Sequence, residues 1–192
     1  MYFLNKSFLF FAISLISLFP NNIKPVFLNE PTSIKYSNGE MSVNLETIAA
    51  NKNLGALKDN LVQTKLIPFY KANQIPDFIK SFIEQLSGSK FTIANSGEDW
   101  QCCDAVIDES LPERLLIYGG KSDKYYLLTY LTGGVGEVTH ILIIKYNQKL
   151  ITNFYTCTTP KKLDNKNSIL EYLTTIEKKR NVLYISKNKL FL

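Results

Sequence analysis

The chain has 192 residues, of which 45% are hydrophobic and 20% are charged. This composition is that of a folded globular protein and excludes an extended disordered chain, and the length suits one domain with a terminal extension. The net charge of +5 is mildly basic and gives only weak support for a partner with an anionic surface.

Residues 1–20 have the pattern of a secretory signal peptide. Lys6 is followed by a mostly apolar run without charge over residues 7–19. As a helix this run would be about 20 Å long, which is shorter than the roughly 30 Å of a hydrocarbon core. A basic start before a short apolar stretch is typical of export signals, so we expect an exported protein that is periplasmic, cell-surface or secreted. The alternative is an uncleaved segment that anchors the protein in the membrane.

Residues 21–73 carry the weakest pattern of the chain. A polar stretch interrupted by Pro25, Pro31 and Gly39 indicates a loop or linker. The apolar residues that follow indicate a broken helix, which Gly55 weakens. We therefore expect a poorly defined linker or helical segment here, and a folded domain over residues 74–192.

The clearest helical pattern lies over residues 74–88, where apolar side chains recur with the spacing of one helical face. Pro76 suits the first turn, Asp77 complements the helix dipole there, and Gly88 suits the C-terminal stop. The sequence therefore predicts an amphipathic helix. Its apolar face would comprise Ile75, Phe78, Ile79, Phe82, Ile83 and Leu86.

After this helix the pattern changes to that of short strands, rich in β-branched and aromatic residues and separated by turn residues. The spacing leaves no room for crossover helices, so neighbouring strands are expected to run antiparallel. The expected strands lie at residues 90–95, 100–107, 113–120, 124–131, 138–146 and 149–157.

A second amphipathic helix is expected over residues 167–180, where Ser168 and Glu171 could form a capping box. Residues 182–186 could add a last strand. This order of elements predicts an α+β domain, with an antiparallel meander sheet of about five to six strands packed by one amphipathic helix before it and another after it.

The sequence Gly120-Lys121-Ser122 matches the end of a phosphate-binding P-loop. The full motif needs a further glycine where this chain has Leu115, and a helix after the loop. Here a strand pattern follows instead, so we interpret this stretch and the glycines of residues 133–137 as hairpin turns. No cofactor is expected.

The chain has three cysteines, of which Cys102 and Cys103 are adjacent and Cys157 is distant. Export would place them in an oxidising compartment, where disulfides form. A bridge between adjacent residues is strained, so a Cys102–Cys157 disulfide is favoured, with Cys103 as a buried free thiol. The alternative is three reduced and buried cysteines.

His140 is the only histidine and has no companions at zinc-ligand spacing, so no metal site is expected. If Asn147 and Gln148 form a two-residue turn, His140 would lie diagonal to Cys157 on one face of the sheet, which would allow a thiol nucleophile. Packing explains both residues more simply. Paired carboxylates could instead serve a hydrolase. The acidic residues around one expected strand are Glu98, Asp99, Asp104, Asp108, Glu109 and Glu113.

The region after Cys157 is basic, but its lysines are spread out and no aromatic stacking motif interleaves them. Nucleic acid is therefore not expected as a partner, while weak contact with an anionic surface is an alternative. The sequence favours an exported, non-enzymatic binding or interaction module. The alternatives are a small extracytoplasmic hydrolase or thiol enzyme, and a binder of anionic surfaces through the basic C-terminal region.

Overall fold

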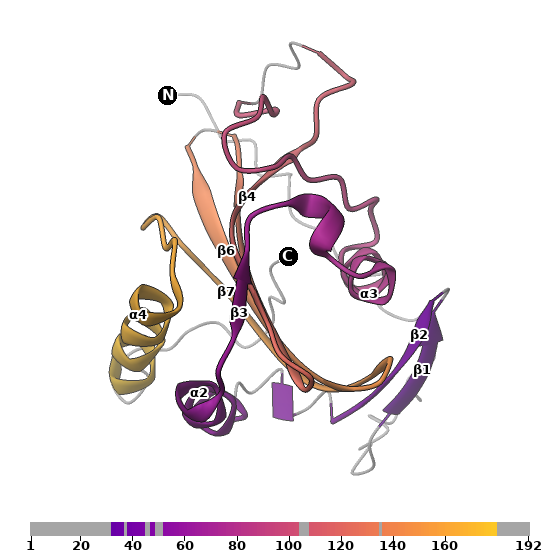
Figure 1. The fold of residues 1–192 in the computed structure, drawn as a ribbon, viewed down its shortest axis with the longest axis vertical. Helices are drawn as coiled ribbons and strands as arrows, with labels where there is room; N and C mark the ends of the chain where they lie inside the picture. The colour runs from indigo at the N-terminus through magenta and orange to yellow at the C-terminus, as the bar shows by residue number, and fades with distance from the viewer. Residues whose placement is uncertain are drawn as a thin grey trace, which may run out of the picture.

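The structure is a computed structural model that describes residues 32–36, 38–44, 47–48, 52–103, 108–134 and 136–179. These residues form an α+β domain built on one seven-stranded sheet of order β1-β2-β7-β6-β5-β4-β3 (Figure 1). The strands are β1 (Thr32–Tyr36), β2 (Gly39–Val43), β3 (Ile67–Phe69), β4 (Arg114–Lys121), β5 (Tyr125–Thr132), β6 (Val138–Asn147) and β7 (Leu150–Thr159). The helices are α2 (Leu54–Gln63), α3 (Asp77–Ser87), α4 (Lys166–Lys179) and a short 3₁₀ helix at Ala72–Gln74.

The α+β class is confirmed, and the sheet differs from the expected meander in one respect. Strands β3 to β7 pair antiparallel, each with the next. The β1–β2 hairpin then joins the far edge through a parallel pairing of β2 with β7, in which Glu40 lies opposite Leu150 and Met41 opposite Ile151. A wholly antiparallel sheet was therefore the wrong expectation.

The described part of the segment before residue 74 contains the helix α2 and also contributes strands to the sheet and side chains to the core. Strands β1, β2 and β3 lie at the two edges of the sheet. Met41 and Val43 alternate into the core along β2, and α2 buries Leu54, Leu57 and Leu61. These strands are too short to show a recognisable alternation of apolar and polar residues. They can be identified only from the strands with which they pair.

Of the expected strands, the four that correspond to β4, β5, β6 and β7 are confirmed. Residues 90–95 contribute one isolated bridge, in which the Ala94 N–H donates to the Arg114 carbonyl at 2.8 Å. Residues 100–103 form no strand. Residues 104–107 and the strand expected at 182–186 lie outside the described residues, as does the expected signal segment.

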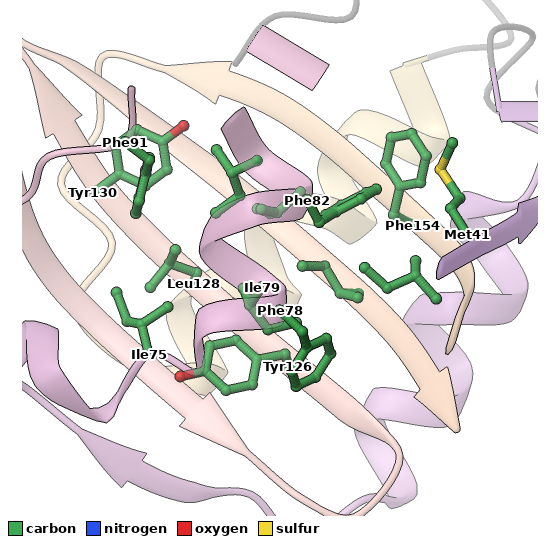
Figure 2. Packing of buried hydrophobic residues seen from close by; sticks show 14 of the residues in the cluster. Met41, Ile75, Phe78, Ile79, Phe82, Phe91, Tyr126, Leu128, Tyr130 and Phe154 are labelled. Carbon is green, nitrogen blue, oxygen red and sulfur yellow. The ribbon is translucent and has the colours of Figure 1, made fainter. Parts of the chain in front are cut away.

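Both faces of the sheet are buried. Helix α3 covers one face, which we call the α3 face, and α2 and α4 cover the other, the α2/α4 face (Figure 1). On the α3 face, aromatic side chains fill the space between helix and sheet (Figure 2). Lys58 of α2 pairs with Glu177 of α4 across the second layer. The described helices include none that is both long and apolar enough to cross a membrane.

Helix α3 forms where its apolar stripe predicts it. Phe78, Ile79, Phe82 and Ile83 are all buried. The helix ends at Gly88, whose φ of 69° is in the left-handed region and whose N–H donates to the Glu84 carbonyl at 2.9 Å. The amphipathic pattern and the glycine stop therefore place this helix directly on the sheet.

Two of the antiparallel pairings contain a bulge that shifts the register. In β4 the extra residue is Ile117, so that Ile117 and Tyr118 both bury on the α2/α4 face. In β7 the pairing passes from Ile151 to Asn153, which leaves Thr152 as the extra residue. A bulge reverses which face the following side chains occupy, so register cannot be counted outward from the turn alone.

Candidate binding site

Three polar side chains are buried together at one end of the α3 face, one from each of β4, β5 and β6. Arg114 is 6% exposed, Tyr130 is 0% exposed and His140 is 7% exposed. Tyr130 lies opposite His140 across β5 and β6, and Arg114 lies opposite Thr132 at the start of β4. We call Arg114, Tyr130 and His140 the polar cluster.

Aromatic contacts fix the orientation of the polar cluster. The Arg114 guanidinium carbon lies 5.2 Å from the centroid of the Phe91 ring, above its face. Phe91 meets Tyr130 edge-on with centroids 5.6 Å apart. Tyr130 stacks on His140 with centroids 4.9 Å apart and planes 2° from parallel. This run of ring contacts across adjacent strands leaves the three polar groups little rotational freedom.

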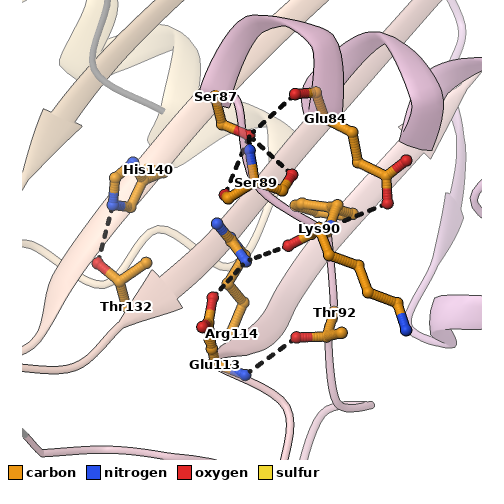
Figure 3. A network of polar contacts seen from close by, with 10 residues as sticks. Glu84, Ser87, Ser89, Lys90, Thr92, Glu113, Arg114, Thr132 and His140 are labelled. Carbon is orange, nitrogen blue, oxygen red and sulfur yellow. Dashed lines mark hydrogen bonds and ion pairs between the residues drawn. The ribbon is translucent and has the colours of Figure 1, made fainter.

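Hydrogen bonds satisfy part of the cluster (Figure 3). Arg114 Nη1 donates to Glu113 Oε2 at 3.1 Å and to the Lys90 carbonyl at 3.4 Å. His140 Nε2 lies 2.8 Å from Thr132 Oγ1. Because the Glu113 side chain is 67% exposed, it is a solvated counterion and compensates the buried guanidinium only weakly.

Each member of the polar cluster also has one buried polar atom that makes no hydrogen bond of normal geometry among the described residues. These atoms are Arg114 Nε, Tyr130 Oη and His140 Nδ1. Buried polar atoms in folded proteins nearly always have a partner, and leaving one unsatisfied costs about 1–3 kcal/mol. Three such atoms in one cluster mark it as the strongest candidate site in the described part of the chain.

At neutral pH the cluster carries the positive charge of Arg114. Burial lowers the pKa of His140 to about 4, and the charge of Arg114 acts in the same direction, so the imidazole is neutral. Burial raises the pKa of Tyr130 to about 12, although the charge of the neighbouring Arg114 guanidinium and a hydrogen-bonding contact with it act in the opposite direction. Arg114 is therefore the one charged member, held beside two neutral groups in a poorly solvated setting.

The contact expected between His140 and Cys157 is not formed. The β6–β7 turn uses Gln148 and Lys149, so Asn147 lies opposite Leu150. The bulge in β7 shifts the register further, and His140 lies opposite Thr158. The two side chains consequently lie on opposite faces: His140 stacks against Tyr130 on the α3 face, whereas the partly buried Cys157 packs on the α2/α4 face.

The expected bridge between Cys102 and Cys157 is not formed either, because both are free thiols in the structure. Cys157 packs against the α2/α4 core, and burial raises its pKa to about 12. Cys102 is exposed, and its backbone rests on Gly133, where an added Cβ would come within 2.3 Å of the Cys102 carbonyl carbon. The adjacent cysteines therefore lie in a loop held against the β5–β6 turn, and Cys103 is partly exposed.

Alkylation of the native protein with iodoacetamide is expected to modify Cys102 well before Cys157. The thiolate is the reactive form, and burial with a pKa of about 12 keeps Cys157 almost entirely protonated. Peptide mass mapping of samples alkylated in buffer and in guanidinium measures the order of reaction. Equal rates in buffer, or a Cys102 that reacts only after reduction, would contradict the free and exposed thiol.

The other motifs form turns or are exposed. Gly120 and Lys121 end β4, and the Ser122 N–H donates to the Tyr125 carbonyl at 2.9 Å, which closes a hairpin where a P-loop would begin a helix. Glu98 accepts hydrogen bonds from Asn95, which lower the pKa of its carboxyl group, and it is exposed. No group of three or more metal-ligating side chains occurs among the residues that the structure describes.

The basic C-terminal region is partly used by the fold. Lys166 at the start of α4 donates from Nζ to the Thr64 carbonyl at 2.7 Å and to the Val62 carbonyl at 3.3 Å, which caps the end of α2. Residues 180–192, which hold several of the other basic groups, lie outside the described part.

Sequence reasoning singled out His140 and missed Arg114 and Tyr130. The sequence did contain a signal for Arg114. Residues two apart in a strand lie on the same face, so if Leu116 points into the core, the charged side chain of Arg114 points there as well. A charge on the core side of an expected strand is uncommon and points to a special environment.

Together the fold and the polar cluster define an α+β domain with a buried cationic site. No known protein family, curated protein or solved structure matches this chain significantly. The functional conclusion therefore depends on the chemistry of the site itself.

Proposed function

We propose that this domain is a non-enzymatic binding module that works outside the cytoplasm and holds a small ligand at the polar cluster. The observation that carries the proposal is the group of three polar atoms without a normal hydrogen bond on Arg114, Tyr130 and His140, residues that are each at most 7% exposed. All three residues lie on adjacent strands at the same end of the α3 face, which favours a ligand shared between them.

The energetics of the cluster favour a functional role over a structural one. Unsatisfied buried groups destabilise the folded chain, and an apolar side chain at Tyr130 or His140 would fill the same core without this cost. Proteins accept such a cost mainly at functional sites, where binding a ligand recovers it. The cluster therefore resembles a binding site that is prepared before its ligand arrives.

The positions of the candidate catalytic groups favour binding over catalysis. His140 and Cys157 lie on opposite faces of the sheet, so the imidazole cannot activate the thiol. With a pKa of about 4, His140 is a weak base and is rarely protonated near pH 7. Glu98 and Asp108, two of the carboxylates considered for a hydrolase, are exposed and bonded within their own turns.

The binding proposal is tested by the small molecules that the protein retains. Protein from the native host would be purified without denaturation, washed by ultrafiltration and then denatured, and the released compounds identified by mass spectrometry. Arg114→Met removes the charge while keeping much of the side-chain volume. Tyr126→Phe is a matched control, because Tyr126 faces the same core and its hydroxyl is satisfied by the Gln74 carbonyl at 2.9 Å.

We expect wild type and Tyr126→Phe to release the same compound in near-equal amount, and Arg114→Met to release little of it. Circular dichroism would verify that all three proteins are folded. If no compound is enriched, or if folded Arg114→Met retains as much as the control, the polar cluster is not a ligand site and the proposal fails.

The compartment is tested separately by the intact mass of the protein recovered from its native host. A mass that lacks about the first 20 residues would support export with removal of a signal peptide. A full-length protein in the membrane fraction would favour the anchored alternative, and a full-length protein in the cytosolic fraction would contradict export.

A further inference from the structure

The polar cluster offers hydrogen-bond donors beside a fixed positive charge. Arg114 Nε–H can only donate, because a guanidinium has no acceptor atom. The Tyr130 hydroxyl can also donate, since burial keeps it in its neutral form. A ligand that satisfies both groups must therefore present acceptor atoms, and a negative charge on these acceptors would complement Arg114.

We propose that the polar cluster binds the carboxylate of a small organic anion, with one oxygen accepting from Arg114 Nε and the other from Tyr130 Oη. This inference rests on the proposed function of the cluster as a ligand site and adds the chemical class of the ligand. It assigns His140 a positioning role, because its ring stacks on Tyr130 and thereby holds the phenol in place.

The charge of the site favours a carboxylate over a neutral ligand. Arg114 is 6% exposed, and its only carboxylate partner within the described residues, Glu113, extends into solvent. The buried guanidinium has already lost most of its hydration, and its counterion compensates it only weakly. An anion that binds beside it therefore gains a strong charge-assisted hydrogen bond. A neutral amide could accept the same hydrogen bonds but would leave the charge uncompensated.

The number of cations favours a carboxylate over a phosphate. The cluster contains one guanidinium, while His140 is neutral and Tyr130 stays protonated. A single positive charge balances a monoanion, whereas a phosphate dianion would be left with excess negative charge in a poorly solvated site. The Phe91 ring beside Arg114 and Tyr130 adds an apolar wall that suits the organic part of such a ligand.

The test uses nuclear magnetic resonance, because His140 is the only histidine and its imidazole signals report on the cluster without ambiguity. The tag-free full chain would be titrated with sodium acetate, acetamide and inorganic phosphate at constant ionic strength. We expect acetate to give a saturable shift of the His140 signals, acetamide to give none, and phosphate to bind more weakly than acetate.

Variants then identify the donors. Arg114→Met should raise the dissociation constant for acetate about tenfold or more, and Tyr130→Phe should raise it about tenfold, as expected when a hydrogen bond to a charged group is lost. Tyr126→Phe should leave it unchanged. Tyr130→Phe is informative even if Arg114→Met fails to fold, because it deletes an unsatisfied hydroxyl and should leave the ligand-free protein at least as stable as wild type.

The remaining outcomes separate this inference from the proposed function. If acetamide binds as well as acetate, or phosphate binds more tightly, the carboxylate assignment is overturned while the cluster remains a ligand site. If acetate gives no saturable shift, or binds all variants equally, the carboxylate assignment is also overturned, and the retained-compound experiment alone decides whether the cluster binds anything.

Discussion

Replacing Phe82 by alanine is expected to lower the free energy of unfolding by about 3–5 kcal/mol. Phe82 is fully buried on α3, and its ring meets Phe154 of β7 edge-on with centroids 5.1 Å apart (Figure 2). Truncation removes this apolar contact and leaves a cavity between helix and sheet, which closely packed neighbours cannot collapse to fill. Chemical denaturation followed by circular dichroism measures the change.

Two further substitutions serve as controls for Phe82→Ala. Phe82→Leu keeps most of the volume and should cost less than half as much. Val62→Ala changes an apolar residue on α2 that is 51% exposed, so we expect a change within about 0.5 kcal/mol. A Phe82→Ala loss no larger than that of Val62→Ala would show that α3 does not pack on this face.

Acidification from pH 7.5 to about 5 is expected to remove about 2 kcal/mol of stability through His140 alone. The pKa of His140 falls from 6.5 to about 4 on folding. Between these values the unfolded chain binds the proton more readily than the folded chain does. The contribution is therefore fully present above the unfolded pKa, and it is lost as the pH falls toward the folded pKa.

The measurement compares unfolding free energies of wild type and His140→Phe across this pH range. The phenyl ring can keep the stack on Tyr130 but cannot take up a proton, so His140→Phe should show a flatter profile. Exposed carboxylates such as Glu98 are common to both proteins and cancel in the difference. A His140 that titrates near its unfolded value by nuclear magnetic resonance would contradict its burial beside Arg114.

The helix α3 and the strands β4 to β7 could be predicted from the residue pattern within each segment. The stripe of residues 75–86 and the stop at Gly88 define α3 without reference to the rest of the chain. Strands β4 to β7 follow from β-branched and aromatic runs between turn residues. The sequence analysis did not predict strands β1 and β2. Both are short, and β2 pairs with β7, which lies more than a hundred residues later in the chain.

The candidate site was harder to predict because it depends on register. His140 was noticed as a single unusual residue, but its neighbours follow from which residues lie opposite it. Counting outward from the expected turn placed it beside Cys157, while the actual turn and the extra residue Thr152 place the two on opposite faces. Arg114 and Tyr130 join His140 only once β4, β5 and β6 are aligned.

The parallel pairing between β2 and β7, which we call the parallel seam, is much shorter than the antiparallel pairings among β4 to β7. The β1–β2 hairpin is joined there at Glu40–Leu150 and Met41–Ile151, and the Glu40 N–H reaches the Lys149 carbonyl at 3.4 Å, a long hydrogen bond. The meander on the other side of the seam is paired along strands of eight to ten residues. The burial of Met41 and Val43 and the Asn38–Ser81 hydrogen bond to α3 add to this short pairing. Because the pairing itself is so short, we expect the amide protons of the hairpin to exchange with solvent before those of the meander.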